Sequence, residues 1–150
     1  MKYYFPSPIG NICLTGDGKN ITSLELNVKA CEYSDSWEVF RIAEKQILEY
    51  FDGKRTEFQL PIHPMGTEFQ LSVWEQVKNI PYGQVITYGD IAKAINSPKA
   101  CRAVGNAVGA NPLPIIIPCH RVVAVNGIGG FSCGLDIKIK LMTLEKIRKM

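Results

Sequence analysis

The sequence predicts an α/β (α+β) fold in two domains: a small N-terminal antiparallel sheet with a helix, then a mostly helical C-terminal domain with a helix-turn-helix. Short strand-like runs separated by turn signals fill the start of the chain. Apolar residues at helical spacing follow them, and two short helices joined by a tight turn come later. A proline-bearing connector at 59–66 sets the expected boundary, with an N-terminal α/β domain over 1–66 and a C-terminal domain over 67–150.

The N-terminal domain is expected to contain three strands and one helix. Strand-like runs occur at 2–5, 11–16 and 21–26, and the turn signal GDGKN separates the last two. The helix is expected from about Asp35 to Phe51, and Gly53 stops it. Its apolar side chains recur at helical spacing: Trp37, Phe40, Ala43, Ile47 and Phe51.

Two capping patterns mark helix starts in the C-terminal domain. Thr67 and Gln70 form the first pattern, so a helix is expected to start near Thr67. Thr87 and Asp90 form the second, which predicts a short helix over 88–95.

Another short helix is expected over 98–109, ending at Gly109. Ser97 would be its N-cap and Pro98 its first residue. Its apolar face would consist of Cys101, Val104 and Val108. With the preceding helix it forms a helix-turn-helix, although many helix pairs of this kind bind nothing.

The opposite face of this helix carries one long cation on a surface of small residues. Arg102 is flanked by Ala100, Ala103 and Gly105, and Lys99 precedes it. Small residues let a helix backbone approach another surface closely, which suits entry into a DNA groove. A solvated surface arginine is the alternative interpretation.

Net charge differs between the two halves of the chain. Residues 1–66 carry 7 Lys and Arg against 9 Asp and Glu, a net −2, whereas 67–150 carry 10 against 5, a net +5. Such asymmetry is typical of a protein in which one half faces a polyanion. A chance imbalance on a solvated surface explains it equally well, so charge alone decides nothing.

The cysteine pattern indicates a reducing, cytoplasmic compartment. No apolar run is long enough to span a membrane, and the start of the chain lacks the apolar core of a signal peptide. No two cysteines form a C-x-x-C pair, and nothing supports a disulfide framework. The cysteines are Cys13, Cys31, Cys101, Cys119 and Cys133.

The stretch IPCHRV at 117–122 brings a thiol, an imidazole and a guanidinium together after the apolar run 114–117, which we expect to be a buried strand. A lone cysteine is most often a small buried hydrophobe. We adopt that interpretation for Cys13, Cys31 and Cys101. Cys119 differs because His120 adjoins it and a nearby histidine can take a thiol proton.

The geometry between these two neighbours stays open. Adjacent side chains on an extended strand point to opposite faces. Either the chain bends at Pro118, or a water carries the proton from Cys119 to His120. The histidine also needs an orienting partner, and Glu145 on an expected C-terminal helix over 138–150 is a candidate.

These motifs resemble those of the methylated-DNA–protein-cysteine methyltransferases, also called O6-alkylguanine-DNA alkyltransferases. IPCHRV is similar to the active-site motif of the family. Three longer stretches follow the family pattern in order and spacing, and SPIG near the start also fits: 66–92, 102–123 and 129–145. The resemblance covers most of the chain, weakly before Gly66 and strongly after it.

The resemblance implies a set of catalytic roles. Cys119 would be the acceptor thiolate, and His120, acting through a water and oriented by Glu145, would draw off its proton. Tyr88 would lie over the extruded guanine, donate to its N3 and oppose its phosphate. Asn111 would tie the DNA-binding helices to the active-site segment.

It also implies how DNA and the damaged base are held. Arg102 would fill the gap left in the base stack, with its helix in the minor groove and Lys99, Ala100, Ala103 and Gly105 around it. The pocket would be built from Pro114, Val122, Phe131, Ser132 and Cys133, with backbone groups at Cys119, Val122 and Ser132 reading the guanine edge. At Cys133 relatives carry glycine or a bulky aromatic residue.

The implied activity is a single alkyl transfer per molecule, without metal or cofactor, by a monomer with a ribonuclease-H-like N-terminal domain. The partner would be double-stranded DNA bearing O6-alkylguanine, with O4-alkylthymine as a further lesion left open. Some relatives bind zinc through the N-terminal domain. Here His63 aligns with one ligand position but Cys13 and Cys31 do not match, so we predict no zinc.

Three other classes of protein explain these motifs less completely. A non-catalytic lesion sensor of the same fold would lack the Cys119 thiol. A helix-turn-helix transcription factor would not require the PCHRV stretch, and a cysteine hydrolase would not require the surrounding pattern.

Overall fold

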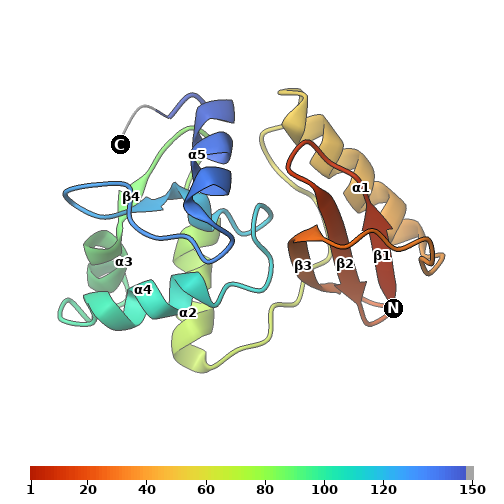
Figure 1. The fold of residues 1–150 in the computed structure, drawn as a ribbon. Coiled ribbons are helices and arrows are strands. Elements are labelled where there is room, and N and C mark those ends of the chain that lie inside the picture. Colours follow the sequence, from red (N-terminus) through yellow and green to blue (C-terminus); the bar gives the residue numbers. More distant parts are fainter. Residues whose placement is uncertain (148–150) are drawn as a thin grey trace. The chain divides into compact units, whose positions relative to one another are not determined.

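The computed structural model describes residues 1–147 and divides into two compact units, Met1–Met65 and a second that begins at Gly66 (Figure 1). The mixed α/β fold class expected from the sequence is confirmed, with an antiparallel sheet first and a helical region after it. Within the described residues no helix is both long and apolar enough to cross a membrane.

The first unit is built on a three-stranded antiparallel sheet. Its strands are β1 (Lys2–Phe5), β2 (Asn11–Gly16) and β3 (Ile21–Val28), in the order β1-β2-β3. β3 runs two residues further than expected, because Val28 pairs with Asn11 at the far end of β2. The inward side chains Ile12 and Leu14 are fully buried, which makes this face of the sheet the core of the unit.

Helix α1 (Glu38–Phe51) covers this sheet and begins three residues later than predicted. The preceding residues serve the sheet instead, since the backbone N–H of Asp35 donates to the carbonyl of Lys2 and the Lys2 N–H donates to the Asp35 carboxylate. The predicted apolar face is confirmed, since three of its five residues are fully buried and the other two are half-buried. Its fully buried members are Phe40, Ala43 and Ile47.

The second unit opens with two capped helices, as predicted. In α2 (Glu68–Lys78) the Thr67 hydroxyl accepts from the Gln70 N–H at 3.1 Å, and the Gln70 side chain accepts from the Thr67 N–H. The same reciprocal pair forms between Thr87 and Asp90 at the start of α3 (Tyr88–Ala94). These local bonds satisfy donors that every helix start leaves exposed.

Helix α4 (Cys101–Gly109) packs against α3 and completes the helix-turn-helix, but it starts later than predicted. The N–H of Ala100 donates to the carbonyl of Ser97 in a turn, so Ser97 is not the N-cap and Pro98 is not helical. The predicted apolar face is wrong at Cys101, which is exposed at the first residue of the helix, and right at Val104 and Val108.

The apolar run 114–117 is buried as expected, but it is not a strand. The Ile117 N–H donates to the Leu113 carbonyl at 2.8 Å, and Ile115 takes a left-handed φ of 74°. The Asn111 side chain supports this turn by donating to the Ile117 carbonyl and accepting from the Leu113 N–H. These bonds satisfy locally the backbone groups that a strand would have paired with a neighbour.

The chain then forms a 3-10 turn and a short parallel pair of strands. The turn is η1 (Cys119–Arg121), and β5 (Val122–Val123) pairs with β4 (Ile86–Thr87). Helix α5 (Leu135–Leu144) follows, so the expected C-terminal helix begins earlier and ends earlier than 138–150. Lys146 takes a φ of 60° just after it, and the last part of the prediction, 148–150, lies outside the described residues.

Of the three cysteines expected to be small buried hydrophobes, only Cys13 fits. It is 2% exposed in the core of the first unit, whereas Cys31 and Cys101 are exposed. Cys31 lies after the end of β3, and Cys101 lies at a helix start, so neither position faces a core.

Candidate active site

Cys119 lies at the start of the 3-10 turn, and the residue is 4% exposed. Pro118 bends the chain there, with φ −79° and ψ 67°, and its carbonyl accepts from the Arg121 N–H. The bend at Pro118, one of the two arrangements left open by the sequence, is therefore observed, and it is compatible with a water between the thiol and the imidazole. The turn directs Cys119 and His120 to different sides of one tight loop, because successive residues of a 3-10 helix are rotated by a third of a turn.

His120 is fully buried against Glu145, the pairing that the sequence predicted. His120 Nε2 lies 2.5 Å from Glu145 Oε2, and both side chains are excluded from solvent. Glu145 occupies the C-cap position of α5 rather than the helix itself. A carboxylate accepts the Nε2 proton, so Nδ1 becomes the basic nitrogen of the imidazole.

Arg121 shares the same carboxylate and was not predicted to take part. Its Nε donates to Glu145 Oε1 at 2.8 Å and its Nη2 to Oε2 at 3.0 Å, while Nη1 donates to the Ile80 carbonyl. The Gly83 N–H donates to Oε1 as well. This bidentate ion pair with a backbone donor beside it fixes the carboxylate in one orientation.

Burial decides the protonation states of the site. It lowers the pKa of His120 below its ordinary value, and the hydrogen bond with Glu145 opposes that shift. Burial also raises the pKa of the Cys119 thiol to about 12, against the opposing effects of the Asn111 side chain and the Lys138 charge. The resting site therefore holds a neutral thiol and a neutral imidazole, so a base must remove the thiol proton before Cys119 can act as a nucleophile.

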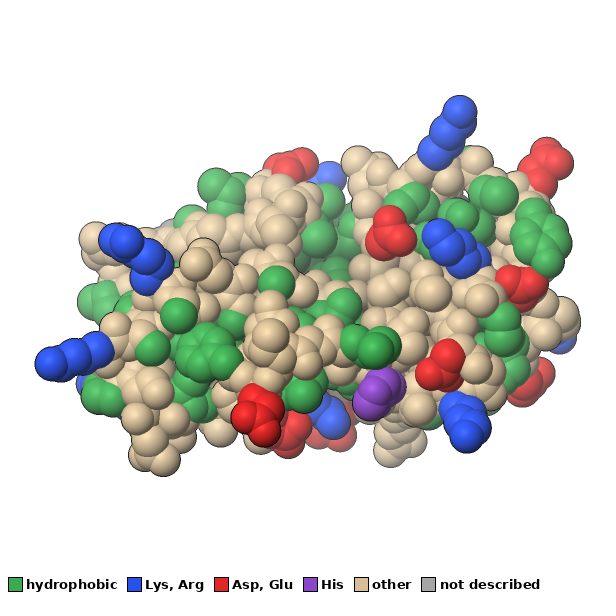
Figure 2. Space-filling model, turned by 90° about the horizontal axis from the view of Figure 1, so that it is seen from below, with side chains coloured by type: hydrophobic (Ala, Val, Ile, Leu, Met, Phe, Trp, Pro, Cys, Tyr) green, Lys and Arg blue, Asp and Glu red, His purple; other side chains and the backbone are tan. Residues whose placement is uncertain are grey.

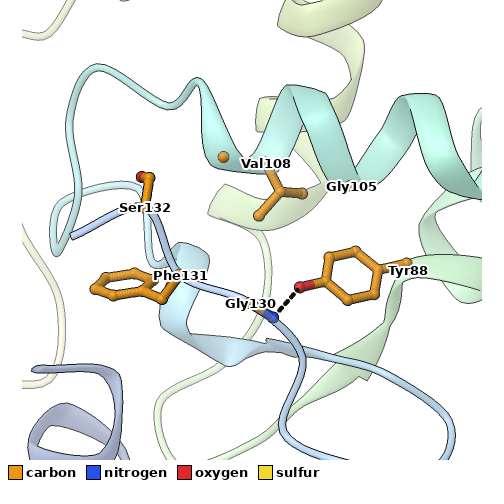
Figure 3. Close-up of a pocket in the computed structure, with 7 residues that line it drawn as sticks. Tyr88, Gly105, Val108, Gly130, Phe131 and Ser132 are labelled. Atoms are coloured by element: carbon orange, nitrogen blue, oxygen red, sulfur yellow. Dashed lines mark hydrogen bonds between the residues drawn. The ribbon is translucent and has the colours of Figure 1, made fainter. Parts of the chain in front are cut away.

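A cavity of about 330 Å³ lies between α4 and the segment 130–132, with Tyr88 on a further side (Figure 3). This volume is at the small end of the range for ligand pockets. The Tyr88 hydroxyl accepts from the Gly130 N–H at 3.2 Å, which leaves its own proton available to donate. The neighbouring Gly129 must be glycine, since it has a φ of 77° and an added Cβ would lie 2.7 Å from the Tyr88 hydroxyl oxygen.

The predicted pocket residues are only partly brought together at this cavity. Tyr88, Phe131 and Ser132 line it, and so does Gly105, which the sequence placed on the DNA-binding face. Of the other predicted members, Pro114 and Val122 are buried and Cys133 is half-buried, and none of the three is among the lining residues within 1–147. The lining residues that the sequence interpretation missed are Val108, Gly109 and Gly130.

The predicted DNA-binding residues flank or form the start of α4. Arg102 and Ala103 are exposed on the helix, whereas Lys99 and Ala100 belong to the turn before it. The Lys and Arg side chains visible in Figure 2 stand apart from one another and do not form a continuous patch. Arg102 is thus an exposed long cation beside the exposed Ala103 and the half-buried Ala100 and Gly105.

Lys138 is the second residue that the sequence interpretation missed. It lies on α5, is fully buried, and donates through Nζ to three backbone carbonyls. No pattern in the sequence marks it, because long cations are usually exposed and only the packing of α5 shows that this one is buried.

Asn111 connects the helix-turn-helix to the thiol, as the resemblance implied. Its backbone N–H donates to the Val108 carbonyl near the end of α4, and its side chain supports the turn before Cys119. Within residues 1–147, no cluster of three His, Cys, Asp or Glu side chains could hold a metal ion.

A helix-turn-helix unit that contains a buried thiol, a His–Glu pair and a small cavity is the combination expected of a DNA-binding protein with a reactive cysteine. Comparison with known proteins narrows this class. The model of the 6-O-methylguanine DNA methyltransferase DNA-binding domain matches residues 68–147, and that of the ribonuclease-like domain of the same family matches residues 1–64. The chain therefore belongs to the 6-O-methylguanine DNA methyltransferase family.

Individual relatives agree with this membership. The methylated-DNA–protein-cysteine methyltransferase of Methanosarcina acetivorans is 49% identical, over 95% of this chain and 97% of that protein. The Haemophilus influenzae protein of the same name is 40% identical, over 96% and 85%. The crystal structure of Mycobacterium tuberculosis OGT in complex with DNA matches with a TM-score of 0.87 at 40% identity, over 95% of this chain and 91% of that one. The family and the class of enzyme expected from the sequence are thus confirmed.

Proposed function

We propose that this protein repairs O6-alkylguanine in double-stranded DNA by moving the alkyl group onto Cys119. The observation that carries the proposal is a buried thiol at the start of a turn whose next residue, His120, is paired with Glu145. Family membership supports the reaction, and the relative crystallised with DNA supports the partner.

The transfer needs a thiolate, which the resting site does not contain. In the proposed first step, His120 takes the thiol proton at Nδ1 through a water, while Glu145 stabilises the imidazolium that forms. The Asn111 side chain lowers the pKa of Cys119 by hydrogen bonding to it. Because burial raises the pKa of the thiol, Cys119 needs a base fixed in position to become a thiolate.

The second step breaks one bond and forms another. The Sγ of Cys119 attacks the alkyl carbon, the bond from that carbon to guanine O6 breaks, and its electron pair stays with the base. The guanine regains a proton at N1, which balances the proton that Cys119 lost. Tyr88 assists by donating to N3 of the departing base, since its hydroxyl already accepts from Gly130 and keeps its own proton for donation.

A base inside a duplex is out of reach, so we propose that the guanine is flipped into the cavity. Flipping costs a few kcal/mol, and less for a poorly paired lesion. Arg102 would offset part of that cost by filling the gap in the stack, with α4 in the minor groove and Lys99, Ala100, Ala103 and Gly105 close to the DNA. Tyr88 would oppose the phosphate of the flipped nucleotide.

The cavity between α4 and 130–132 would receive the base. Phe131 and Ser132 would form one wall, and Pro114, Val122 and Cys133 the deeper part toward the thiol. Backbone groups at Cys119, Val122 and Ser132 would read the guanine edge. Because Cys119 is buried, the transfer requires a small movement of the pocket wall as the base enters.

The product is a thioether, which contains no low-pKa leaving group. We therefore propose one turnover per molecule, stoichiometric and irreversible, with no metal or cofactor in the chemical step. We further propose that the protein acts as a monomer, that O4-alkylthymine is within its lesion range, and that the acceptor thiol works in a reducing cytoplasm. DNA binding and transfer would belong to the domain at 67–150, with 1–66 as a separate domain.

The test is the intact mass of the protein after incubation with a duplex containing O6-methylguanine. We expect each molecule to gain one methyl group, located on Cys119 by peptide mapping, with the amount of repaired DNA never exceeding the amount of protein. The variant C119S should gain nothing and still bind the duplex with unchanged affinity, because the thiol acts in chemistry and the helices act in binding. A methyl group on another residue, or many turnovers per molecule, would overturn the proposal.

A further inference from the structure

Lys138 is a buried cation whose partners are all backbone carbonyls. Its Nζ donates to Val122 at 2.7 Å, to Ile128 at 2.6 Å and to Gly130 at 2.9 Å, and its side chain is fully buried. No carboxylate among residues 1–147 forms an ion pair with it. A buried charge without a counter-charge is unfavourable, so the position of this lysine in the core needs an explanation beyond filling space.

The three carbonyls belong to two different parts of the candidate site. Val122 follows the 3-10 turn, and its N–H donates back to the Cys119 carbonyl. Gly130 lines the cavity, and its N–H donates to the Tyr88 hydroxyl (Figure 3). One ammonium group therefore links the turn that carries the thiol to the segment that forms the pocket wall.

The charge of Lys138 also acts on the reacting groups. It lowers the pKa of the Cys119 thiol and of His120. Burial in turn lowers the pKa of Lys138 to about 8, while Cys119 opposes that shift. Among the titratable groups around the thiol, His120 is held neutral by burial and Cys133 acts to raise the pKa of Cys119, so Lys138 is the group whose charge favours the thiolate.

We propose that Lys138 is a positioning residue for alkyl transfer: its ammonium holds the pocket wall against the thiol turn and keeps a fixed positive charge near Cys119 when the thiolate forms. It does so without touching the substrate. This inference rests on the proposed transfer to Cys119 and adds to it a residue outside the Cys–His–Glu group.

The experiment measures the second-order rate constant for transfer from free O6-benzylguanine between pH 6.5 and 9.5, with the full chain and intact mass as the readout. The variants are K138M, which removes the charge and the donors, and K138Q, which keeps a neutral donor. K140M is the matched control, because Lys140 is exposed on the same helix. The midpoint of thermal unfolding is recorded for each protein.

At pH 7 we expect K138M to react roughly tenfold or more slowly than the original protein, since a nearby opposite charge shifts a pKa by about 1–3 units. Lys138 is charged below its pKa of about 8 and neutral above it. The rate constants of the original protein and of K138M should therefore become more similar above pH 8. The original protein loses its charge there, whereas K138M has none at any pH. K138Q should remain slow, and K140M should behave as the original protein.

A purely structural role gives a different pattern. It predicts that K138M has a lower unfolding midpoint and that the rate ratio between the original protein and K138M is the same at every pH. That result would overturn the proposal, and so would full rescue by K138Q. If K138M does not fold, K138Q carries the same pH comparison. If the original protein itself acquires no benzyl group, the proposed function fails rather than the role of Lys138.

Discussion

The exchange of Glu145 for glutamine tests the buried ion pair and the catalytic base together. The Glu145 carboxylate accepts from Arg121 and from the Gly83 N–H, and it pairs with His120. Removing one partner of a buried ion pair destabilises a protein by about 3–5 kcal/mol, because the other charge stays buried without compensation. The glutamine carbonyl can still accept one hydrogen bond from Arg121, so we expect the lower end, about 3 kcal/mol.

The chain supplies its own control for this measurement. Glu49 also pairs with an arginine, at 3.0 Å from Arg55, but its side chain is 31% exposed and that of Arg55 is 28% exposed. An exposed pair contributes about 0–1 kcal/mol, so E49Q should change stability by less than 1 kcal/mol. Both variants lose one carboxylate beside one arginine, and they differ in burial and in the further partners of Glu145, which are His120 and the Gly83 N–H.

Each unit contains one tryptophan, so the unfolding of each unit can be followed separately by tryptophan fluorescence. Trp37 lies in the first unit and Trp74 in the second, so urea titration of a W37F background reports the second unit alone. At a slope of about 1.5 kcal/mol per molar, E145Q should lower the urea midpoint by roughly 2 M. E49Q is measured in the same way in a W74F background.

The rate of benzyl transfer from O6-benzylguanine completes the test. General-base catalysis contributes typically 10²–10⁴-fold, and without the carboxylate His120 loses its orientation and its counter-charge, so we expect a loss of roughly 10²-fold in E145Q. A stability change no larger than that of E49Q would refute the ion-pair argument. An unchanged rate in a stable E145Q protein would refute the role of Glu145 in activating Cys119.

Two further predictions separate the binding helix from the pocket. R102A should slow repair of duplex DNA much more than reaction with free O6-benzylguanine, because only the duplex requires base flipping. The control K99A should lower DNA affinity without that difference between substrates. Equal slowing of R102A on both substrates would assign Arg102 to the fold instead. C133W should reduce benzyl transfer more than methyl transfer on the same oligonucleotide, since Cys133 follows the pocket residue Ser132. Poor fit weakens binding of an alkyl group by only about 1–3 kcal/mol per methylene, whereas a steric clash with tryptophan can exclude the group altogether. An unchanged benzyl-to-methyl ratio would show that residue 133 does not border the alkyl group.

The features predicted well from the sequence are those fixed by local bonds. The capping boxes at Thr67 and Thr87 are short-range hydrogen-bond patterns, and both form. The apolar run 114–117 shows the limit of such signals, because a short buried run has the same composition in a strand and in a turn. Here the choice is made by Asn111, whose side chain pairs with the turn, and by Ile115 at positive φ.

The sequence also predicted only some of the residues of the candidate site. Cys119, His120 and Glu145 could be picked out because a thiol beside an imidazole is unusual and the family motif marks the third residue. Arg121 and Lys138 could not, because long cations are usually exposed and only tertiary packing reveals that these two are buried. The family resemblance predicted Phe131 and Ser132 as pocket residues, but it missed the contribution of Val108, Gly109 and Gly130, because no local pattern encodes the approach of α4 to the segment 130–132.

The arrangement of α4 links the two halves of the proposed mechanism. Gly105 and Val108 line the cavity, and Arg102 lies three residues before Gly105, on the same side of the helix and one turn nearer its start. A helical turn spans about 5.4 Å, so the side chain proposed to enter the base stack and the wall proposed to receive the base are held on one rigid element. The Tyr88 ring lies 3.9 Å from where a Cβ on Gly105 would be, an ordinary van der Waals contact, so only a residue larger than alanine would narrow the space between helix and ring. In this mechanism the displaced base travels only a short way to the cavity, and insertion and capture require no hinge within the helix.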